Sequence, residues 1–460
     1  MNEPSRNYNA VTDLVDRHVS AGRGSRIAFV DADGVLSYAG LQARTRRFAN
    51  VLKALGIHAE QRIALVMQDS VDFPVVFLGA MRASVVPIPL NTMLPVEQIA
   101  YVLADCRARA LFVSAALYPA LAPVLGRLGT LEHVVVVGGA IEQSRGLAEL
   151  LAAAAPDAPT APTWPDEPAF WLYSSGSTGS PKGVKHVHSS LMATAATYGR
   201  QVLGIREDDV CFSAAKLFFA YGLGNALTFP LAVGATSILY AERPTPAAVF
   251  ALLKQHAPTL FFAVPTLYAA MLGDPALAAE KGSPRWRLCV SAGEALPEHV
   301  GKAWKARFGV DILDGVGSTE MLHIFLSNSP GEIRYGRSGR PVPGYDARLV
   351  GEAGHDVADG EVGEMLVRGP SAAEGYWNQR DKSRGTFEGA WTRTGDKYTR
   401  DADGVYTYCG RSDDMFMCRA SGCRPSRSRA RSSPTPPCWR PPSSPPPTRT
   451  SLSSQKPMSC

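Results

Sequence analysis

Short apolar runs alternate with amphipathic stretches over most of this chain. Three runs rich in β-branched residues predict short buried strands: 62–67, 110–113 and 133–138. Between them, residues 38–55 and 95–104 have the periodicity of helices. Strands that alternate with helices predict an α/β fold with mostly parallel strands.

The pattern changes along the chain. Residues 152–167 are rich in Ala and Pro and predict a connecting loop, and a second α/β unit runs from about residue 192 to 313. After Gly339, short strands and turns predict a small β-rich subdomain. Because 460 residues are too many for one core, we expect a large N-terminal domain over 1–412. Its predicted parts are two α/β subdomains, 1–167 and 168–338, and a β-rich subdomain, 339–412.

Composition sets the expected location. The chain has no run of eighteen apolar residues, and its N-terminus lacks the charged-then-apolar pattern of a signal peptide. We therefore expect a cytoplasmic protein. Cys106, Cys211, Cys289 and Cys409 lack metal-ligand spacing and predict reduced, mostly buried thiols.

The net charge of +5 comes from the last part of the chain. From Met415 onward there are seven Arg, one Lys and no acidic residue, so without these eight charges the net charge is −3. A mildly acidic body gives no reason to expect nucleic acid or an anionic membrane as a partner.

The stretch 173–183, Tyr-Ser-Ser-Gly-Ser-Thr-Gly-Ser-Pro-Lys-Gly, carries the main candidate chemistry. Glycines let backbone N–H groups approach an anion, and the hydroxyls and Lys182 add donors and charge. It is not a Walker loop, because Gly183 rather than Ser or Thr follows the lysine, which disfavours a P-loop NTPase. A flexible linker is also disfavoured, because an apolar strand pattern precedes the stretch and helical sequence follows it. The residues predict a phosphate cradle.

Four further motifs follow in order: Ser-Ala-Gly-Glu-Ala-Leu-Pro at 291–297, Asp-Gly-Val-Gly-Ser-Thr-Glu at 314–320, Trp-Thr-Arg-Thr-Gly-Asp-Lys at 391–397 and Tyr-Cys-Gly-Arg-Ser-Asp-Asp at 408–414. Each one alone also fits a helix cap, a turn or a solvated charge pair. Together with the cradle, over residues 9–414, they resemble the adenylate-forming superfamily of acyl- and aryl-CoA synthetases, luciferases and peptide-synthetase adenylation domains.

This resemblance implies that the chain uses ATP to activate a carboxylate, releasing pyrophosphate, and that the thiol of coenzyme A then attacks the acyl-adenylate. Positioned donors would stabilise the charge that spreads over the phosphoryl oxygens. By resemblance, the β- and γ-phosphates are held by Ser174, Ser175, Gly176, Ser177, Thr178, Gly179 and Lys182. The remaining nucleotide contacts are expected from Thr319 at the α-phosphate, Glu320 at Mg²⁺, Asp396 at the ribose with Arg411 nearby, and Gly293, Glu294 and Ala295 at the adenine. Lys182, Thr319 and Glu320 form the expected catalytic set.

The stretches 216–225 and 318–325 narrow the resemblance to benzoate-CoA ligases and their relatives for substituted benzoates. By position, the acyl pocket is expected from Ala220, Tyr221, Gly222, Gly317, His323 and Ile324. A flat apolar slot suits an aromatic acid. A hydrogen-bonded core histidine is the alternative for His323, and a medium-chain fatty acid is the alternative substrate. His186 and His188 do not predict a metal site, because no third ligand is evident.

Asp413 matches a hinge aspartate of the family, and residues 413–417 form the expected hinge remnant. After this hinge the chain departs from its family. The family continues into a small C-terminal α+β domain with a lysine that contacts the adenylate. Residues 418–460 are instead Pro, Ser and Arg with few large apolar side chains, which predicts disorder. We therefore expect an ATP- and aryl-acid-binding core with weak adenylation and almost no transfer to coenzyme A, or else a non-catalytic binding remnant. A homodimer is left open.

A frame change explains the tail. When codons are read from the third base of the Met417 codon onward, residues 418–429 permit V-S/P-G-I-W-V-S-P-F-E-V-E, a run that is usual in the family. We hypothesise a single-base deletion near this codon, either a sequencing error or a pseudogene, which resequencing tests. The alternative, a disordered basic tail that binds RNA, would need aromatic or Arg-Gly interleaving.

Overall fold

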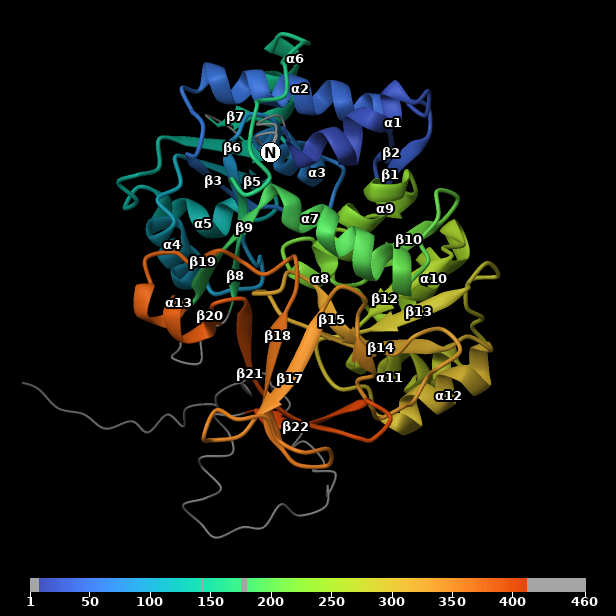
Figure 1. Cartoon of the computed structure of the whole chain (residues 1–460). Coiled ribbons are helices and arrows are strands. Elements are labelled where there is room, and N and C mark those ends of the chain that lie inside the picture. Colours follow the sequence, from blue (N-terminus) through green and yellow to red (C-terminus); the bar gives the residue numbers. More distant parts are fainter. Residues whose placement is uncertain (1–7, 142–143, 175–179, 412–460) are drawn as a thin grey trace, which may run out of the picture. The chain divides into compact units, whose positions relative to one another are not determined.

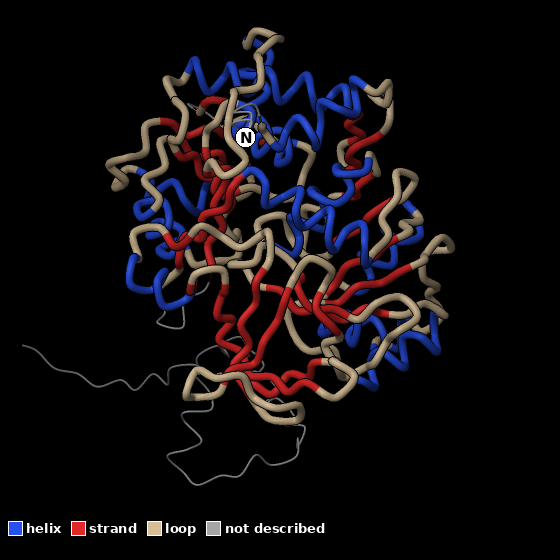
Figure 2. The backbone as a smooth tube through the Cα atoms, in the orientation of Figure 1, coloured by secondary structure: helices blue, strands red, loops and turns tan. Residues whose placement is uncertain are grey.

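The computed structural model describes residues 8–141, 144–174 and 180–411, which belong to one compact unit that ends at Asp414. In this part of the chain the strands form four sheets, with helices packed beside them (Figures 1 and 2). The predicted hinge and tail, 413–417 and 418–460, lie outside the described residues and remain predictions.

The first sheet is five-stranded and parallel, in the order β4-β3-β5-β6-β7. Its strands are β3 (Arg62–Val66), β4 (Val86–Pro89), β5 (Ala110–Ser114), β6 (His133–Val137) and β7 (Arg145–Gly146). The accompanying helices are α2 (Tyr38–Ala54), α3 (Asp72–Arg82), α4 (Val96–Asp105), α5 (Tyr118–Leu125) and α6 (Leu147–Ala153). Helix α2 begins where Ser37 Oγ accepts a hydrogen bond from Gly40 N, as an N-cap serine does. The predicted strands and helices of this region are confirmed to within about two residues, the uncertainty normal at element ends.

The second sheet is nine-stranded, in the order β16-β15-β14-β13-β12-β10-β11-β1-β2, and its middle is parallel. Its strands are β1 (Ile27–Asp31), β2 (Gly34–Ser37), β10 (Val210–Ser213), β11 (Thr236–Ile238), β12 (Leu260–Ala263), β13 (Leu288–Ser291), β14 (Ile312–Gly317), β15 (Ile324–Ser327) and β16 (Arg340–Pro341). The helical segments around it are η1 (Thr12–Asp16), α1 (Arg17–Ser20), α7 (His188–Thr194), η2 (Ala195–Val202), α8 (Ala220–Leu223), η3 (Gly224–Thr228), α9 (Phe229–Val233), α10 (Pro246–His256), α11 (Pro265–Gly273), η4 (Pro275–Leu277) and α12 (Glu298–Phe308). Strands β12 and β13 are buried along their whole length, as expected of parallel strands covered on both faces.

Two smaller antiparallel sheets complete the unit. One joins β17 (Asp346–Val350), β18 (Gly363–Arg368), β21 (Trp391–Arg400) and β20 (Phe387–Glu388), with β22 (Tyr406–Arg411) paired to β21. The other has the order β19-β9-β8, from β8 (Pro168–Ser174), β9 (Lys182–Val187) and β19 (Gly375–Tyr376), and α13 (Arg380–Thr386) follows it. The α/β fold with a β-rich part after Gly339 is confirmed.

The sheets do not follow the predicted boundary at residue 167. Strands β1 and β2 come from the first 40 residues, yet β1 pairs in parallel with β11 of the second sheet. Strand β19, from the β-rich region, pairs with β9. An open sheet edge accepts any strand that can reach it, and the order along the chain does not limit that choice.

The segment after the cradle differs from the prediction. We expected helical sequence there, but β9 comes first and α7 begins only at His188. Strand β9 pairs with β8 from Lys182 to Val187, so the cradle is the loop of a β-hairpin.

In the described part of the chain, no helix combines the length and the apolar character needed to span a bilayer. Among the cysteines there, Cys106, Cys211 and Cys289 are buried free thiols and Cys409 is exposed.

A buried ion pair joins the first helical turns to helix α3. The Arg82 side chain is 1% exposed, and its guanidinium donates to both oxygens of Asp16 at 2.7 and 3.0 Å and to Thr160 Oγ1 at 2.6 Å.

Arg82→Met should therefore lower the free energy of unfolding by about 3–5 kcal/mol, because the Asp16 charge is left without its partner. Denaturant unfolding of this chain measures the loss. Arg46→Met, which breaks an exposed pair with Asp157, is the control and should cost less than about 1 kcal/mol.

Candidate active site

The predicted phosphate cradle lies between two paired strands. Ser174 ends β8 and Lys182 begins β9, and the two are partners in the strand register. The buried Ser174 hydroxyl has no hydrogen-bond partner among the described residues. Ser175, Gly176, Ser177, Thr178 and Gly179 lie outside the described residues, so their roles stay predictions. The loop's two ends are thus held together with an unused hydroxyl donor beside them.

Lys182 lies beside Glu320, as the motif roles require. The two side chains, 13% and 15% exposed, are separated by 3.8 Å between Lys182 Nζ and Glu320 Oε1. Tyr376 joins them, because its hydroxyl donates to Glu320 Oε1 at 2.8 Å and lies 3.4 Å from Lys182 Nζ. Burial lowers the pKa of Lys182, and the Glu320 carboxylate opposes this shift.

The turn that carries Thr319 is fixed from two sides. His186 Nε2, on β9, lies 2.8 Å from Thr319 O, and Ala373 N donates to Glu320 O at 2.8 Å. Burial lowers the pKa of His186 to about 4, so the ring is neutral at pH 7 and can donate a single N–H to this carbonyl. His186 thus ties strand β9 to the Thr319 turn.

Asp396 and Arg411 face each other across β21 and β22. They are register partners, and Arg411 Nη1 donates to Asp396 Oδ1 at 3.1 Å. Burial raises the pKa of Asp396, the Arg411 guanidinium opposes that shift, and the Glu320 carboxylate adds to it. The charges of Glu320 and Asp396 therefore interact. This interaction links the motif 391–397 to the motif 314–320, which itself contacts the cradle through Lys182.

The predicted adenine residues, Gly293, Glu294 and Ala295, form an exposed loop after β13. Gly293 has a φ of +94°, which favours glycine. The loop is tied to β14, because Leu296 N donates to Asp314 Oδ2 at 3.2 Å. The loop therefore follows one strand of the second sheet and is anchored to the strand that leads into the Thr319 turn.

The predicted acyl-pocket residues also come together. Ala220, Tyr221 and Gly222 begin α8, and Gly317 pairs with Ile324 across β14 and β15. His323 connects the two segments: its Nε2 lies 3.3 Å from Tyr221 O and 3.2 Å from Asn225 Oδ1. At Gly317 a Cβ atom would lie 2.6 Å from His323 O, so no side chain fits there.

His323 matches the alternative raised from its sequence. It is buried and hydrogen-bonded, its ring packs edge-on against Phe229, and burial lowers its pKa to about 3. The Tyr221 hydroxyl is also engaged, because it donates to Val290 O at 3.1 Å. Both side chains therefore have hydrogen-bond partners within the protein.

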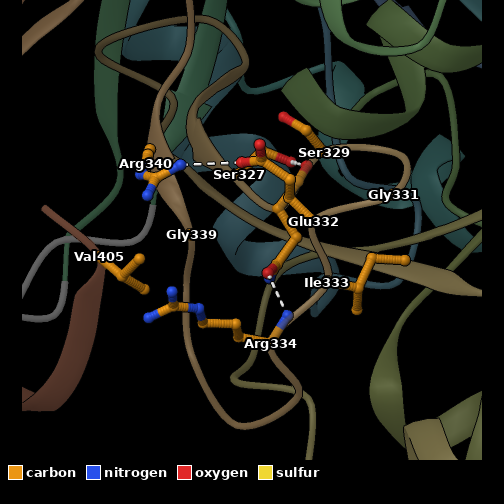
Figure 3. A pocket seen from close by; sticks show the side chains of 10 residues that line it. Ser327, Ser329, Gly331, Glu332, Ile333, Arg334, Gly339, Arg340 and Val405 are labelled. Carbon is orange, nitrogen blue, oxygen red and sulfur yellow. Dashed lines mark hydrogen bonds and ion pairs between the residues drawn. The ribbon is translucent and has the colours of Figure 1, made fainter. Parts of the chain in front are cut away.

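A cavity of about 360 Å³ lies elsewhere. None of the predicted site residues lines it, and its wall comes from Ser327, Asn328, Ser329, Gly331, Glu332, Ile333, Arg334, Gly339, Arg340 and Val405 (Figure 3). Its charges are paired: Arg340 with Glu332 at 2.8 Å, and Arg334 with Asp403 at 2.9 Å. The convergence of the motif residues, and not cavity volume, identifies the candidate site.

Sequence reasoning missed Tyr376. It lies in the two-residue strand β19, where no periodic pattern can arise, and it belongs to none of the five motifs. The available signal was a pair of aromatic residues, Tyr376 and Trp377, directly after a glycine.

Residues 16–377 match the AMP-binding enzyme family. The match covers most of the chain and includes the cradle and the Thr319 motif. The chain belongs to this family. The resemblance predicted from the motifs is confirmed.

Three AMP-binding enzymes are similar to this chain over most of its length. It is 56% identical to the 4-hydroxybenzoate-CoA/benzoate-CoA ligase of Rhodopseudomonas palustris over 413 residues, which are 90% of this chain and 76% of that protein. The crystal structure of a benzoate CoA ligase from Burkholderia xenovorans LB400 matches with a TM-score of 0.83 and 51% identity, covering 88% of this chain and 80% of that one. The anthranilate CoA ligase AuaEII, solved with anthranoyl-AMP, matches with a TM-score of 0.87 and 39% identity, covering 90% and 79%.

Asp314 provides a pH-dependent test of the strand that carries the Thr319 motif. Burial raises its pKa to about 7, far above the value of about 3.9 for an unfolded chain. Between about pH 4 and 7 the folded carboxyl keeps a proton that the unfolded one loses, so stability should fall as the pH rises through this window.

Asp314→Asn removes this titration. From pH 4 to 7, we expect the free energy of unfolding of the unaltered chain to fall relative to that of the variant. The fall should be about 1.4 kcal/mol for each unit between the pKa of Asp314 in the folded chain and its pKa in the unfolded chain. Urea unfolding of both proteins at pH 4, 5.5 and 7 measures the difference. Parallel pH profiles would contradict the buried carboxyl.

Proposed function

We propose that this protein is an aryl-CoA ligase of the benzoate type. It activates an aromatic carboxylate with ATP to an acyl-adenylate, releases pyrophosphate and transfers the acyl group to coenzyme A. The observation that carries the proposal is the 3.8 Å approach of Lys182 to Glu320, two charged residues from distant motifs. The Glu320 carboxylate also acts on Asp396, and the connection that carries Glu320 continues to His323, which contacts Tyr221. The names of the similar enzymes, which act on benzoate, 4-hydroxybenzoate and anthranilate, support the aromatic substrate.

The residues expected to bind ATP fall into groups according to the part of ATP that each would contact. The cradle, Ser174 to Gly179 with Lys182, supplies donors and one positive charge for the β- and γ-phosphates, and Thr319 lies at the α-phosphate. Asp396 accepts from the ribose hydroxyls, with Arg411 beside it, and Gly293, Glu294 and Ala295 flank the adenine. In-line attack by the carboxylate on the α-phosphate needs mainly positioning and charge stabilisation, which these groups supply.

Glu320 fits a magnesium ion. Its side-chain contacts with Tyr376 and Lys182 both use Oε1, and a hard cation prefers carboxylate oxygens. Within the described residues, no three His, Cys, Asp or Glu side chains gather as a metal-binding group. Mg²⁺ would therefore be held through Glu320 and the phosphates of its nucleotide, as is usual for this ion, and would neutralise phosphate charge when bound.

The acid would lie against Ala220, Tyr221 and Gly222 on one side and Gly317, His323 and Ile324 on the other. Because the hydroxyl of Tyr221 and Nε2 of His323 already have partners, these rings offer apolar faces to a flat ring. The turn 317–320 connects this group to Thr319 and Glu320, so the carboxylate end of the acid would face the α-phosphate.

An AMP-formation assay tests the function. Benzoate, 4-hydroxybenzoate, anthranilate and a medium-chain fatty acid are each given to this chain with ATP and Mg²⁺. The same assay is run on a second protein, which is encoded by the gene with its reading frame restored after the Met417 codon. AMP formation with the aromatic acids, faster in the second chain, supports an aryl-CoA ligase. Formation with the fatty acid alone overturns the aromatic assignment, and ATP binding without AMP in either chain indicates a binding remnant.

Asp396→Ala should weaken ATP binding by about 1.5–3 kcal/mol, because a hydrogen bond to a charged acceptor is lost. Isothermal titration of this chain with ATP and Mg²⁺ measures the loss. Asp346→Ala removes the same charge from an exposed pair with Arg368 in the same sheet and is the control. Equal ATP affinity in all three proteins would refute the assignment of Asp396 to the ribose.

A further inference from the structure

Tyr376 stands between two charged side chains, Lys182 of the cradle and Glu320 of the motif 314–320. Its hydroxyl donates to Glu320 Oε1 at 2.8 Å and accepts from Lys182 Nζ at 3.4 Å, while Nζ also lies 4.5 Å from the centre of the tyrosine ring. The direct Lys182–Glu320 distance, 3.8 Å, is longer than that of a close ion pair. The hydroxyl therefore occupies the place where the ammonium and the carboxylate would otherwise meet.

The tyrosine is held firmly in this place. Tyr376 pairs with Val184 across β19 and β9, and its N donates to Ser383 Oγ at 2.9 Å. Its ring is 5.4 Å from that of Phe387, and the residue is 6% exposed. Burial raises the pKa of Tyr376 and the Glu320 carboxylate adds to the shift, so the hydroxyl keeps its proton and remains a donor at neutral pH.

We propose that Tyr376 is a positioning residue for the nucleotide site, which keeps Glu320 and Lys182 from closing into a direct ion pair. The proposal rests on the proposed function. With the hydroxyl in place, Glu320 keeps Oε2 for a cation and Lys182 keeps protons for a phosphate. Without it, two charges less than 4 Å apart in a largely buried site attract strongly and close on each other. The triphosphate and its magnesium ion must then break that pair before they bind.

The test is Tyr376→Phe, which removes only the hydroxyl. ATP affinity, measured by titration calorimetry with Mg²⁺, should fall about tenfold, which equals the loss of one hydrogen bond to a charged group. Tyr335→Phe is the matched control, because Tyr335 donates to Asp311 at 3.0 Å and Asp311 pairs with Lys305, so the same hydroxyl is removed beside an ion pair away from the motif residues. It should leave ATP affinity within about twofold, a change of less than 0.5 kcal/mol.

A double-mutant cycle separates positioning from packing. In a Glu320→Gln background the side chain at 320 carries no charge to pair with Lys182. Tyr376→Phe should then change ATP affinity less than about twofold, because coupled residues are not additive. An equal loss in both backgrounds overturns the proposal, as does unchanged affinity in the Tyr376→Phe protein. If the unaltered chain itself binds no ATP, the proposed function fails, and this role fails with it.

A second variant guards against misfolding. Ser383→Ala leaves the hydroxyl of Tyr376 in place but removes the acceptor that fixes its backbone N–H. It should weaken ATP binding less than Tyr376→Phe does, and only when Glu320 is present. If the Tyr376→Phe protein does not fold, Ser383→Ala is tested with Glu320 present and in the Glu320→Gln background. An equal loss of ATP affinity in the two backgrounds overturns the proposal.

Discussion

The candidate site depends on the pairing of strand β9 on both of its edges. On one edge Gly183 pairs with Tyr173 of β8, and on the other its carbonyl accepts from Trp377 N at 2.8 Å. A Cβ atom on Gly183 would lie 3.1 Å from the Tyr173 ring and 3.3 Å from Trp377 Cβ, so the three segments approach closely only because this residue is glycine. The first α/β region joins the same point, because Trp377 Nε1 and the Tyr173 hydroxyl donate to O and Oδ2 of Asp105, respectively.

This arrangement places charge where water is scarce. Lys182, Glu320 and Asp396 are mostly buried, and burial disfavours the charged form of each isolated group. The neighbours offset part of that cost: a tyrosine hydroxyl at Glu320, a guanidinium at Asp396, and a carboxylate near Lys182. These neighbours hold the charged groups in place, and charged groups held in this way need little reorganisation to stabilise a triphosphate.

One short connection links the two halves of the proposed chemistry. Gly317 and Ile324 pair where β14 meets β15, and the turn between them carries Thr319 and Glu320. His323, in the same connection, packs against Tyr221 of α8, so the segment that would face the acid and the segment that would face the phosphates are held together. A reaction in which a carboxylate attacks a phosphorus atom depends on such fixed proximity. The benzoate CoA ligase of Burkholderia xenovorans LB400, at 51% identity, has the same fold over 88% of this chain.

The sequence by itself determined the α/β class, three strands (β3, β5 and β6) and two helices (α2 and α4) of the first sheet region, and the family. Hydrophobic periodicity and short motifs are local, so they can be read from neighbouring residues. It did not predict that β1 would join the second sheet, that a strand would follow the cradle, or that Tyr376 would separate Lys182 from Glu320. Those features were decided only by the tertiary structure, because the side-chain contacts of Tyr376 join residues 56 and 194 positions apart and no local pattern records which strand will reach a sheet edge.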